Sequence, residues 1–166
     1  NNIFWLLKKD RKINKLKKLN HLSEISNNYD TFIIDLWGVM HNGIKLNSNA
    51  IEAIENLTNS SKKIVFLSNA PRPSLKVINF LLKMGMDKKY LSSVITSGEA
   101  AMYEINQNKF GKTFFHLGPP RDTSVFEKVR ENKTNIDQCD FILCTGLFDN
   151  YDNDLNFYRE FLKKHI

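Results

Sequence analysis

The sequence predicts an α/β fold built on a parallel sheet, and three observations support this prediction. From Tyr29 onward, short apolar segments alternate with segments of helical periodicity. The apolar segments are continuous in Val, Ile, Leu and Phe, which is typical of strands buried on both faces of a parallel sheet. All four prolines lie in two loops, 68–73 and 118–122, that directly follow strands. These features together predict right-handed crossovers, with rigid loops at the carboxyl edge of the sheet, where ligands bind in such folds.

Five strands are expected where apolar residues run together, at residues 31–34, 63–67, 93–96, 113–117 and 140–144. The intervening helices are expected from apolar residues spaced three and four apart. The first follows the cap candidates Ser48 and Asn49, with its apolar face reaching Leu57. The second covers about 74–84 and ends before Gly85, a typical residue after a helix end. Three more are expected over about 98–107, 123–131 and 153–164.

The formal charge of +6 is concentrated in one segment. Residues 8–18 hold seven basic residues and one acidic residue, so the rest of the chain is neutral overall. Because no aromatic residues are interleaved for base stacking and no groove-reading motif is present, we expect a solvated arm and no specific nucleic-acid partner. A nucleic-acid-associated protein that uses this arm is the alternative.

The sequence contains no apolar run near the length of about 18 residues that a membrane-spanning helix needs, so we expect no membrane association. Its two cysteines, Cys139 and Cys144, are too few for a disulfide framework. Free thiols are typical of a reducing compartment, and we therefore expect a cytoplasmic protein.

Candidate chemistry lies at the ends of the first two strands. Asp35 directly follows strand 31–34, and Ser68 and Asn69 follow strand 63–67. If these strands are neighbours, a carboxylate and a hydroxyl face the same pocket. Gly38 and Gly43 would let the intervening loop turn tightly and bring backbone amides close to an anion.

This combination suits attack of Asp35 on phosphorus, with a divalent cation neutralising the charge between nucleophile and phosphate. Magnesium fits, because it is usually held by one or two carboxylates and keeps waters and phosphate oxygens as its other ligands. The structural alternative is that Asp35 merely caps its loop and that Ser68 caps the helix after it. Spacing alone leaves both interpretations open.

Two segments at the right separation resemble motifs I and II of the haloacid dehalogenase (HAD) superfamily. They are residues 35–39, Asp-Leu-Trp-Gly-Val, followed by Gly43, and about thirty residues later residues 67–73, Leu-Ser-Asn-Ala-Pro-Arg-Pro. The chain looks most like the subclass IIA hydrolases, which include nucleotide and sugar phosphatases, and within them a branch with tryptophan in motif I. Segments 95–100, 116–122 and 144–147 also resemble that branch, so the resemblance covers about 29–166.

The resemblance implies a Rossmann-like core that is interrupted after its third strand by an α/β cap domain. With a basic arm at residues 1–28, the first part of the core would occupy 29–108 and the first part of the cap 109–166. The chain begins at Asn1 rather than Met and would stop inside the cap. We therefore expect an incomplete fragment that is inactive by itself.

The resemblance also implies specific roles. Asp35 would be the nucleophile and a magnesium ligand, and the main-chain carbonyl of Trp37 would be a second ligand. Ser68 would bind phosphate through its hydroxyl, and Asn69 would help to shape the pocket. The implied activity is magnesium-dependent hydrolysis of small phosphorylated metabolites through an aspartyl-phosphate intermediate.

Two departures from the family pattern leave alternatives open. Phosphatases of this superfamily usually carry a second aspartate two residues after the nucleophile, where this chain has Trp37, and general acid–base help is worth roughly 10²- to 10⁴-fold. The chain would then be a slow phosphatase, a catalytically weak binding or regulatory domain, or a dehalogenase-like enzyme acting at carbon. We expect the indole to be buried and to shield the pocket from water. The motif III lysine and motif IV acids would lie beyond Ile166.

Four further residues have both a functional and a structural interpretation. His41 either reaches the pocket or belongs only to its loop, and His116 is expected to be a hydrogen-bonded core residue. Arg72 and Arg121 are candidates for bidentate contact with a substrate anion, or else ordinary surface residues beside prolines.

Overall fold

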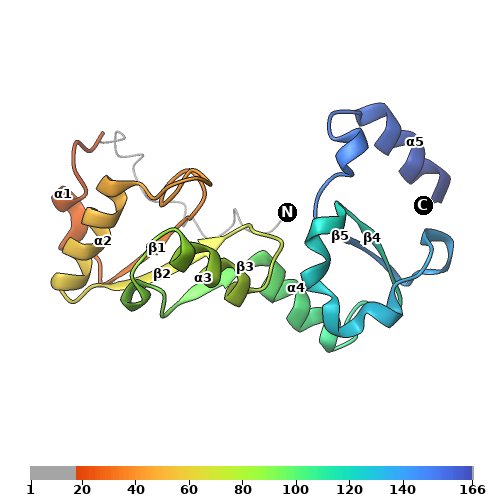
Figure 1. The fold of residues 1–166 in the computed structure, drawn as a ribbon, viewed down its shortest axis with the longest axis horizontal. Helices are drawn as coiled ribbons and strands as arrows, with labels where there is room; N and C mark the ends of the chain where they lie inside the picture. Colours follow the sequence, from red (N-terminus) through yellow and green to blue (C-terminus); the bar gives the residue numbers. More distant parts are fainter. Residues whose placement is uncertain (1–17, 166) are drawn as a thin grey trace, which may run out of the picture.

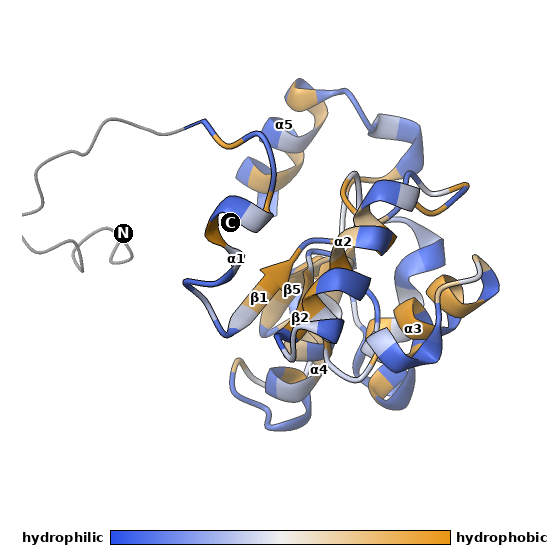
Figure 2. Ribbon diagram, turned by 90° about the vertical axis from the view of Figure 1, so that its left-hand side faces the viewer, coloured by the Kyte–Doolittle hydropathy of each residue, from blue (hydrophilic) through white to orange (hydrophobic). Residues whose placement is uncertain are grey.

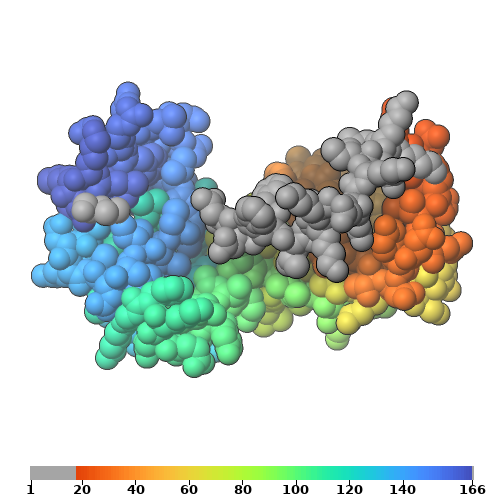
Figure 3. Space-filling view, turned by 180° about the vertical axis from the view of Figure 1, so that it is seen from behind, coloured from red at the N-terminus to blue at the C-terminus, as the bar shows by residue number. Residues whose placement is uncertain are grey.

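The computed structural model describes residues 18–165, which form two parallel sheets. The sheets lie in two lobes at opposite ends of an elongated molecule, and helix α4 (Ser97–Asn106) lies between them (Figure 1). The view from behind shows the same division, with residues from red to yellow in one lobe and from cyan to blue in the other (Figure 3). The predicted α/β fold with parallel strands is therefore confirmed.

The first sheet contains β1 (Thr31–Ile34), β2 (Lys63–Ser68) and β3 (Val94–Thr96) in the order β1-β2-β3. Each differs from its predicted range by one residue at most. Helices α2 (Ser48–Asn59) and α3 (Ser74–Lys83) connect these strands. The register pairs Ile34 with Phe66 and Ser68 with Thr96, so the three strands end at the same edge of the sheet.

The ends of these helices follow from local hydrogen bonds. The α2 cap is Asn47, whose side chain accepts a hydrogen bond from the amide of Asn49 at 3.2 Å, so the predicted cap residues Ser48 and Asn49 are wrong. Helix α3 ends before Gly85, as predicted, and Gly85 has the positive φ of +92° that favours glycine. A short helix, α1 (Ser23–Ser26), precedes the sheet.

Only one face of the first sheet is covered within residues 18–165, which corrects the prediction of strands buried on both faces. Phe66 packs there with Ile54 of α2 and Leu81 of α3 in the main core. On the other face, Ile33, Leu67 and Ile95 are exposed. Both right-handed crossovers step in the same direction along the sheet, so both helices lie on the same side. Figure 2 shows β1 and β2 as strongly hydrophobic strands beside these helices.

The second sheet contains β4 (Phe114–Leu117) and β5 (Phe141–Cys144), both within the predicted ranges. A second core forms where Phe114 packs with Phe126 and with Ile105 of α4. Helix α4 thus belongs to the packing of the second lobe although it starts at the end of β3. The last helix is α5 (Leu155–His165).

The helix predicted over 123–131 is wrong. The chain there forms two 3₁₀ segments, η3 (Pro120–Val125) and η4 (Glu127–Asn132), with non-helical backbone angles inside each. The stretch begins with Thr123 and Ser124, and both residue types have a lower intrinsic helix preference than alanine or leucine. Further 3₁₀ turns occur at η2 (Lys88–Tyr90), η5 (Ile136–Gln138) and η6 (Asp149–Tyr151).

The basic segment 8–18 lies outside the described residues except for Lys18. Within residues 18–165, no helix has the length and apolar character needed to cross a membrane.

Candidate active site

Asp35 lies directly after β1 and is exposed at the carboxyl edge of the first sheet. Its Oδ1 accepts a hydrogen bond of 2.7 Å from the amide of Leu36, so the loop orients the carboxylate as expected. Leu36 is buried in the main core, which holds this amide in place. The second carboxylate oxygen, Oδ2, accepts no hydrogen bond within residues 18–165 and is available for chemistry.

The loop after Asp35 is tightly turned. Gly38 and Gly43 have φ angles of +78° and +89°, as the sequence pattern requires. The amide of Gly38 donates to the carbonyl of His41 at 2.8 Å, and the amide of Gly43 donates to His41 Nδ1 at 3.0 Å. Gly38 therefore shapes the loop, with its own amide already engaged.

Trp37 is 63% exposed, so the expectation of a buried indole is wrong. The ring packs edge-on against His41 at 5.5 Å between centroids, and a Cβ on Gly43 would come within 2.7 Å of it. His41 is itself buried and packs against Phe80 of α3 at 5.5 Å. Both residues line a cleft beside the sheet edge. His41 therefore reaches the pocket and also helps to hold its loop together.

Ser68, at the end of β2, lies beside Asp35 as predicted from neighbouring strands. The two residues, with Asn69, border a hollow of about 590 Å³ on the open side of the sheet. Ser68 and Asn69 also line the larger cleft of about 810 Å³ that contains Trp37. The Ser68 hydroxyl accepts a hydrogen bond of 3.2 Å from the amide of Ala70, so it shapes its own loop and does not cap α3.

The loop 68–73 is held by residues for which the sequence predicted no role. Ser97 Oγ donates to the carbonyls of Asn69 at 2.9 Å and Ala70 at 3.0 Å. Thr96 Oγ1, which is buried, donates to the carbonyl of Arg72 at 2.6 Å. The signal in the sequence is the Thr-Ser-Gly run where β3 meets α4. These bonds fix the proposed phosphate loop to the neighbouring strand.

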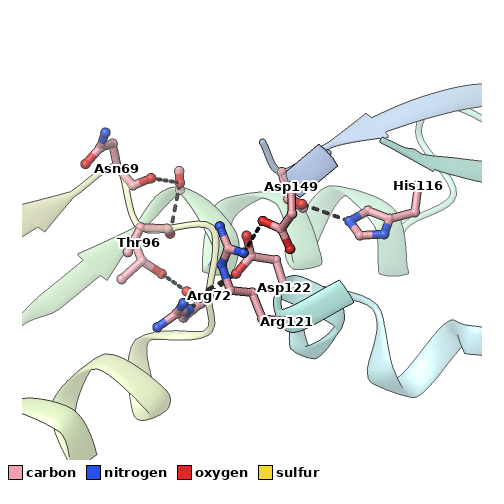
Figure 4. A network of polar contacts seen from close by, with 10 residues as sticks. Asn69, Arg72, Thr96, His116, Arg121, Asp122 and Asp149 are labelled. Atoms are coloured by element: carbon pink, nitrogen blue, oxygen red, sulfur yellow. Dashed lines mark hydrogen bonds and ion pairs between the residues drawn. The ribbon is translucent and has the colours of Figure 1, made fainter. Parts of the chain in front are cut away.

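Arg72 connects the two lobes (Figure 4). Its Nε lies 3.4 Å from Oδ1 of Asp122 in η3, and the Asp122 side chain is almost completely buried. Arg121, which lies in η3, pairs with Asp149 of η6. Both arginines line the larger cleft, although each already has a carboxylate partner within the chain.

His116 is a hydrogen-bonded core residue, as expected. Its Nε2 lies 2.8 Å from Thr145 Oγ1, a contact visible at the right of Figure 4. Burial, together with the charge of Lys133, lowers the pKa of His116 below 6.5, and Asp122 opposes this shift. Burial likewise lowers the pKa of His41, and the nearby Asp35 carboxylate partly opposes it.

The oxygens at the end of β1 fit part of a magnesium site. Magnesium takes hard oxygen ligands and retains several waters. The Asp35 carboxylate is exposed, and the Trp37 carbonyl accepts no hydrogen bond from residues 18–165. No group of three or more His, Cys, Asp or Glu residues that could hold a metal occurs in this part of the chain. The donors here are thus one carboxylate and one carbonyl, with room for water and phosphate oxygens.

Gly98→Ala is expected to destabilise the protein, although alanine normally stabilises a helix by about 1 kcal/mol relative to glycine. A Cβ at Gly98 would lie 2.3 Å from the backbone nitrogen of Arg72. Overpacking of this kind costs about 1 to 3 kcal/mol, so we expect a lower melting temperature. Gly146→Ala is the matched control, because its nearest neighbour would be a proline side-chain carbon at 3.3 Å. Equal melting temperatures for the two variants would contradict the close approach.

Acidification is expected to destabilise the protein through His116. Its pKa is lowered in the folded state, so between the folded and unfolded pKa values the unfolded chain binds more protons. This contribution to stability is therefore fully present above the unfolded pKa of about 6.5 and is lost as the pH falls from there through the lower pKa of the folded state. We expect the melting temperature of His116→Gln to change less than that of the wild type between about pH 7.5 and about pH 5.5. His21→Gln, on an exposed residue, is the control, and an unchanged pH dependence in His116→Gln would contradict the assignment.

Comparison with known proteins agrees with this geometry. Residues 32–130 match the family model of haloacid dehalogenase-like hydrolases. A haloacid dehalogenase-like hydrolase from Brucella suis is 26% identical, with a TM-score of 0.74 over 88% of this chain and 55% of that one. A 4-nitrophenylphosphatase from Thermotoga maritima is 28% identical, with a TM-score of 0.56 over 85% of this chain and 51% of that one. No curated protein sequence matches this chain.

A glycerol phosphate phosphatase from Mycobacterium tuberculosis, solved in complex with magnesium, is similar in fold alone. It is 19% identical, with a TM-score of 0.52 over 74% of this chain and 38% of that one. The chain spans about half the length of the Brucella and Thermotoga structures. The family model nevertheless covers more than half of the sequence, and Asp35 and Ser68 both lie within the matched residues. This chain belongs to the haloacid dehalogenase-like hydrolases.

Proposed function

We propose that the protein is a magnesium-dependent phosphatase of small phosphorylated metabolites that works through an aspartyl-phosphate intermediate. One observation carries the proposal: Asp35, whose carboxylate is oriented by the Leu36 amide, borders the same hollow as Ser68. A nucleophile and a phosphate-binding donor thus meet at the carboxyl edge of a parallel sheet, where ligands bind in such folds.

In the first step, Asp35 Oδ2 attacks phosphorus, and the ester bond to the leaving oxygen breaks. The leaving oxygen takes a proton from water, because position 37 carries no acid. In the second step, water attacks the phosphorus of the aspartyl phosphate, which releases inorganic phosphate and restores the Asp35 carboxylate. Ser68 donates a hydrogen bond to a phosphate oxygen in both steps, and Asn69 and Arg72 complete the loop around it.

Magnesium would be held by the Asp35 carboxylate and the Trp37 carbonyl, and it would neutralise charge between carboxylate and phosphate. We further propose that the chain is of subclass IIA, in the branch with tryptophan in motif I, and that it acts in the cytoplasm. The first part of the core would then occupy residues 29–108, and the first part of the cap 109–166.

The test is hydrolysis of 4-nitrophenyl phosphate by the protein in its full natural length. We expect turnover that requires magnesium and stops when a chelator removes it. A folded protein that binds inorganic phosphate with no turnover would instead favour a binding or regulatory domain, which the tryptophan at position 37 makes the second candidate.

A further inference from the structure

The larger cleft runs from the end of β2 to the 3₁₀ segments of the second lobe. Its volume of about 810 Å³ is in the range of pockets that enclose small-molecule ligands and leaves room for more than a phosphate group. Leu36, Val77 and Phe80 provide an apolar wall. Ser68 borders both this cleft and the hollow next to Asp35, so a molecule whose phosphate is bound at Ser68 can extend into the cleft.

The charged residues that line this cleft are mainly cationic. Arg72, Lys76, Arg121 and Arg130 face one carboxylate, that of Glu127. Concave surfaces with one sign of charge concentrate ions of the opposite sign. Cationic side chains that no carboxylate neutralises also repel one another, so this arrangement favours an anionic occupant.

Two of the four cations have no partner in the described part of the chain. Arg72 and Arg121 are paired with Asp122 and Asp149, which lie outside the cleft lining. Lys76 and Arg130 make no side-chain hydrogen bond or ion pair within residues 18–165.

These two residues come from different lobes. Lys76 lies in the first turn of α3, at the positive end of that helix, and Arg130 lies in η4 of the second lobe. A ligand that contacts both would therefore bridge the two walls of the cleft.

We propose that the preferred substrate carries a second anionic group, a carboxylate or a second phosphate, which Lys76 and Arg130 bind. This inference rests on the proposed function and adds the substrate class. Arginine binds carboxylates and phosphates through two parallel hydrogen bonds, and lysine contributes a point charge. Glu127 opposes the second anion and limits the affinity for it.

The experiment compares substrates that differ only in the second charge, at fixed free magnesium. Phosphoglycolate is paired with 2-hydroxyethyl phosphate to test a carboxylate, and propane-1,3-diol bisphosphate with 3-hydroxypropyl phosphate to test a phosphate. We expect the doubly anionic member of at least one pair to have a kcat/KM about ten-fold higher, equivalent to about 1.4 kcal/mol. The pair with the larger preference identifies the second group.

Substitutions assign the preference to residues. Lys76→Gln and Arg130→Gln should each remove most of the preference for the doubly anionic substrate by raising its KM. The kcat/KM for the hydroxyl-bearing esters should stay within about two-fold of the wild-type value. Lys128→Gln is the control, because Lys128 is exposed on η4 and does not line the cleft. Glu127→Gln should act in the opposite direction and strengthen the preference. Equal kcat/KM within both pairs, or a preference unchanged in both cationic variants, would overturn the inference and leave the phosphatase proposal standing.

A binding measurement separates the two proposals. Calorimetry with phosphonoacetate and methylphosphonate, neither of which is a phosphate ester, needs no turnover. Tighter binding of phosphonoacetate that is lost in Arg130→Gln would support the anion site even if every ester proved inert. Equal binding of the two phosphonates, together with equal kcat/KM in the carboxylate pair, would rule out a carboxylate.

Discussion

Replacing Asp35 by asparagine is expected to abolish phosphate-ester hydrolysis. An amide neither attacks phosphorus nor binds magnesium well, and removal of an enzyme's nucleophile costs about 10⁴-fold or more. The folded structure should survive, because Asp35 is exposed and the variant keeps a side-chain oxygen for the hydrogen bond from Leu36. The measurement is kcat for 4-nitrophenyl phosphate, with the melting temperature recorded alongside.

Asp30→Asn is the matched control for this variant. Asp30 is an exposed carboxylate just before β1, and its only ion pair within residues 18–165 is a contact of 3.7 Å with Lys62. The control should keep its full activity. Activity of Asp35→Asn within a few-fold of the wild type would remove Asp35 from the mechanism.

Replacing Trp37 by aspartate is expected to raise turnover of unactivated phosphate esters by about ten-fold or more, because general acid–base catalysis by a well-positioned group contributes roughly 10²- to 10⁴-fold. The new carboxylate would protonate the leaving oxygen and then activate water. Aryl phosphates should gain less, because their leaving groups need less protonation. Because Trp37 is exposed, the variant should stay folded. Truncation of a buried tryptophan would have lowered the free energy of unfolding by roughly 3 to 5 kcal/mol. The comparison is kcat for an alkyl phosphate and for 4-nitrophenyl phosphate.

Trp37→Asn separates the acid from the loss of the indole. It removes the same ring from Gly43 and His41 but supplies no titratable group. The gain should therefore occur in Trp37→Asp alone. A well-folded Trp37→Asp protein with no gain on either substrate would show that Trp37 does not stand in for an acid, and would favour dehalogenase-like or binding roles.

The strands of this fold could be predicted because their signal is local. Residues 31–34, Thr-Phe-Ile-Ile, are β-branched or aromatic and are followed by an acid, and β1 has these bounds. The helix prediction for 123–131 was wrong because apolar spacing favoured a helix there. In the structure, Val125 and Phe126 are buried in the second core by 3₁₀ turns instead. The open face of the first sheet depends on the direction of both crossovers, which apolar runs do not encode.

Part of the candidate site could likewise be predicted from the sequence, and part could not. Convergence of Asp35 and Ser68 followed from the rule that parallel strands end at one edge of the sheet. The pairing of Arg72 with Asp122 joins residues fifty positions apart, and the bonds from Thr96 and Ser97 to the loop 68–73 depend on the register of β3. The Thr-Ser-Gly run marks the hydroxyl donors in the sequence, but a single sequence does not show which partners these residues or Arg72 contact.

The central claim is that Asp35 carries the phosphoryl group, and chemical trapping tests it directly. The full-length protein is mixed with 4-nitrophenyl phosphate and magnesium, quenched in acid and treated with borohydride, which reduces an aspartyl phosphate to homoserine. Without an acid at position 37, breakdown of the intermediate should limit turnover, so the intermediate accumulates. We expect homoserine at position 35 in a large fraction of the wild-type chains and none in Asp35→Asn. Steady release of 4-nitrophenol with Asp35 unmodified, or homoserine at another aspartate, would contradict the account.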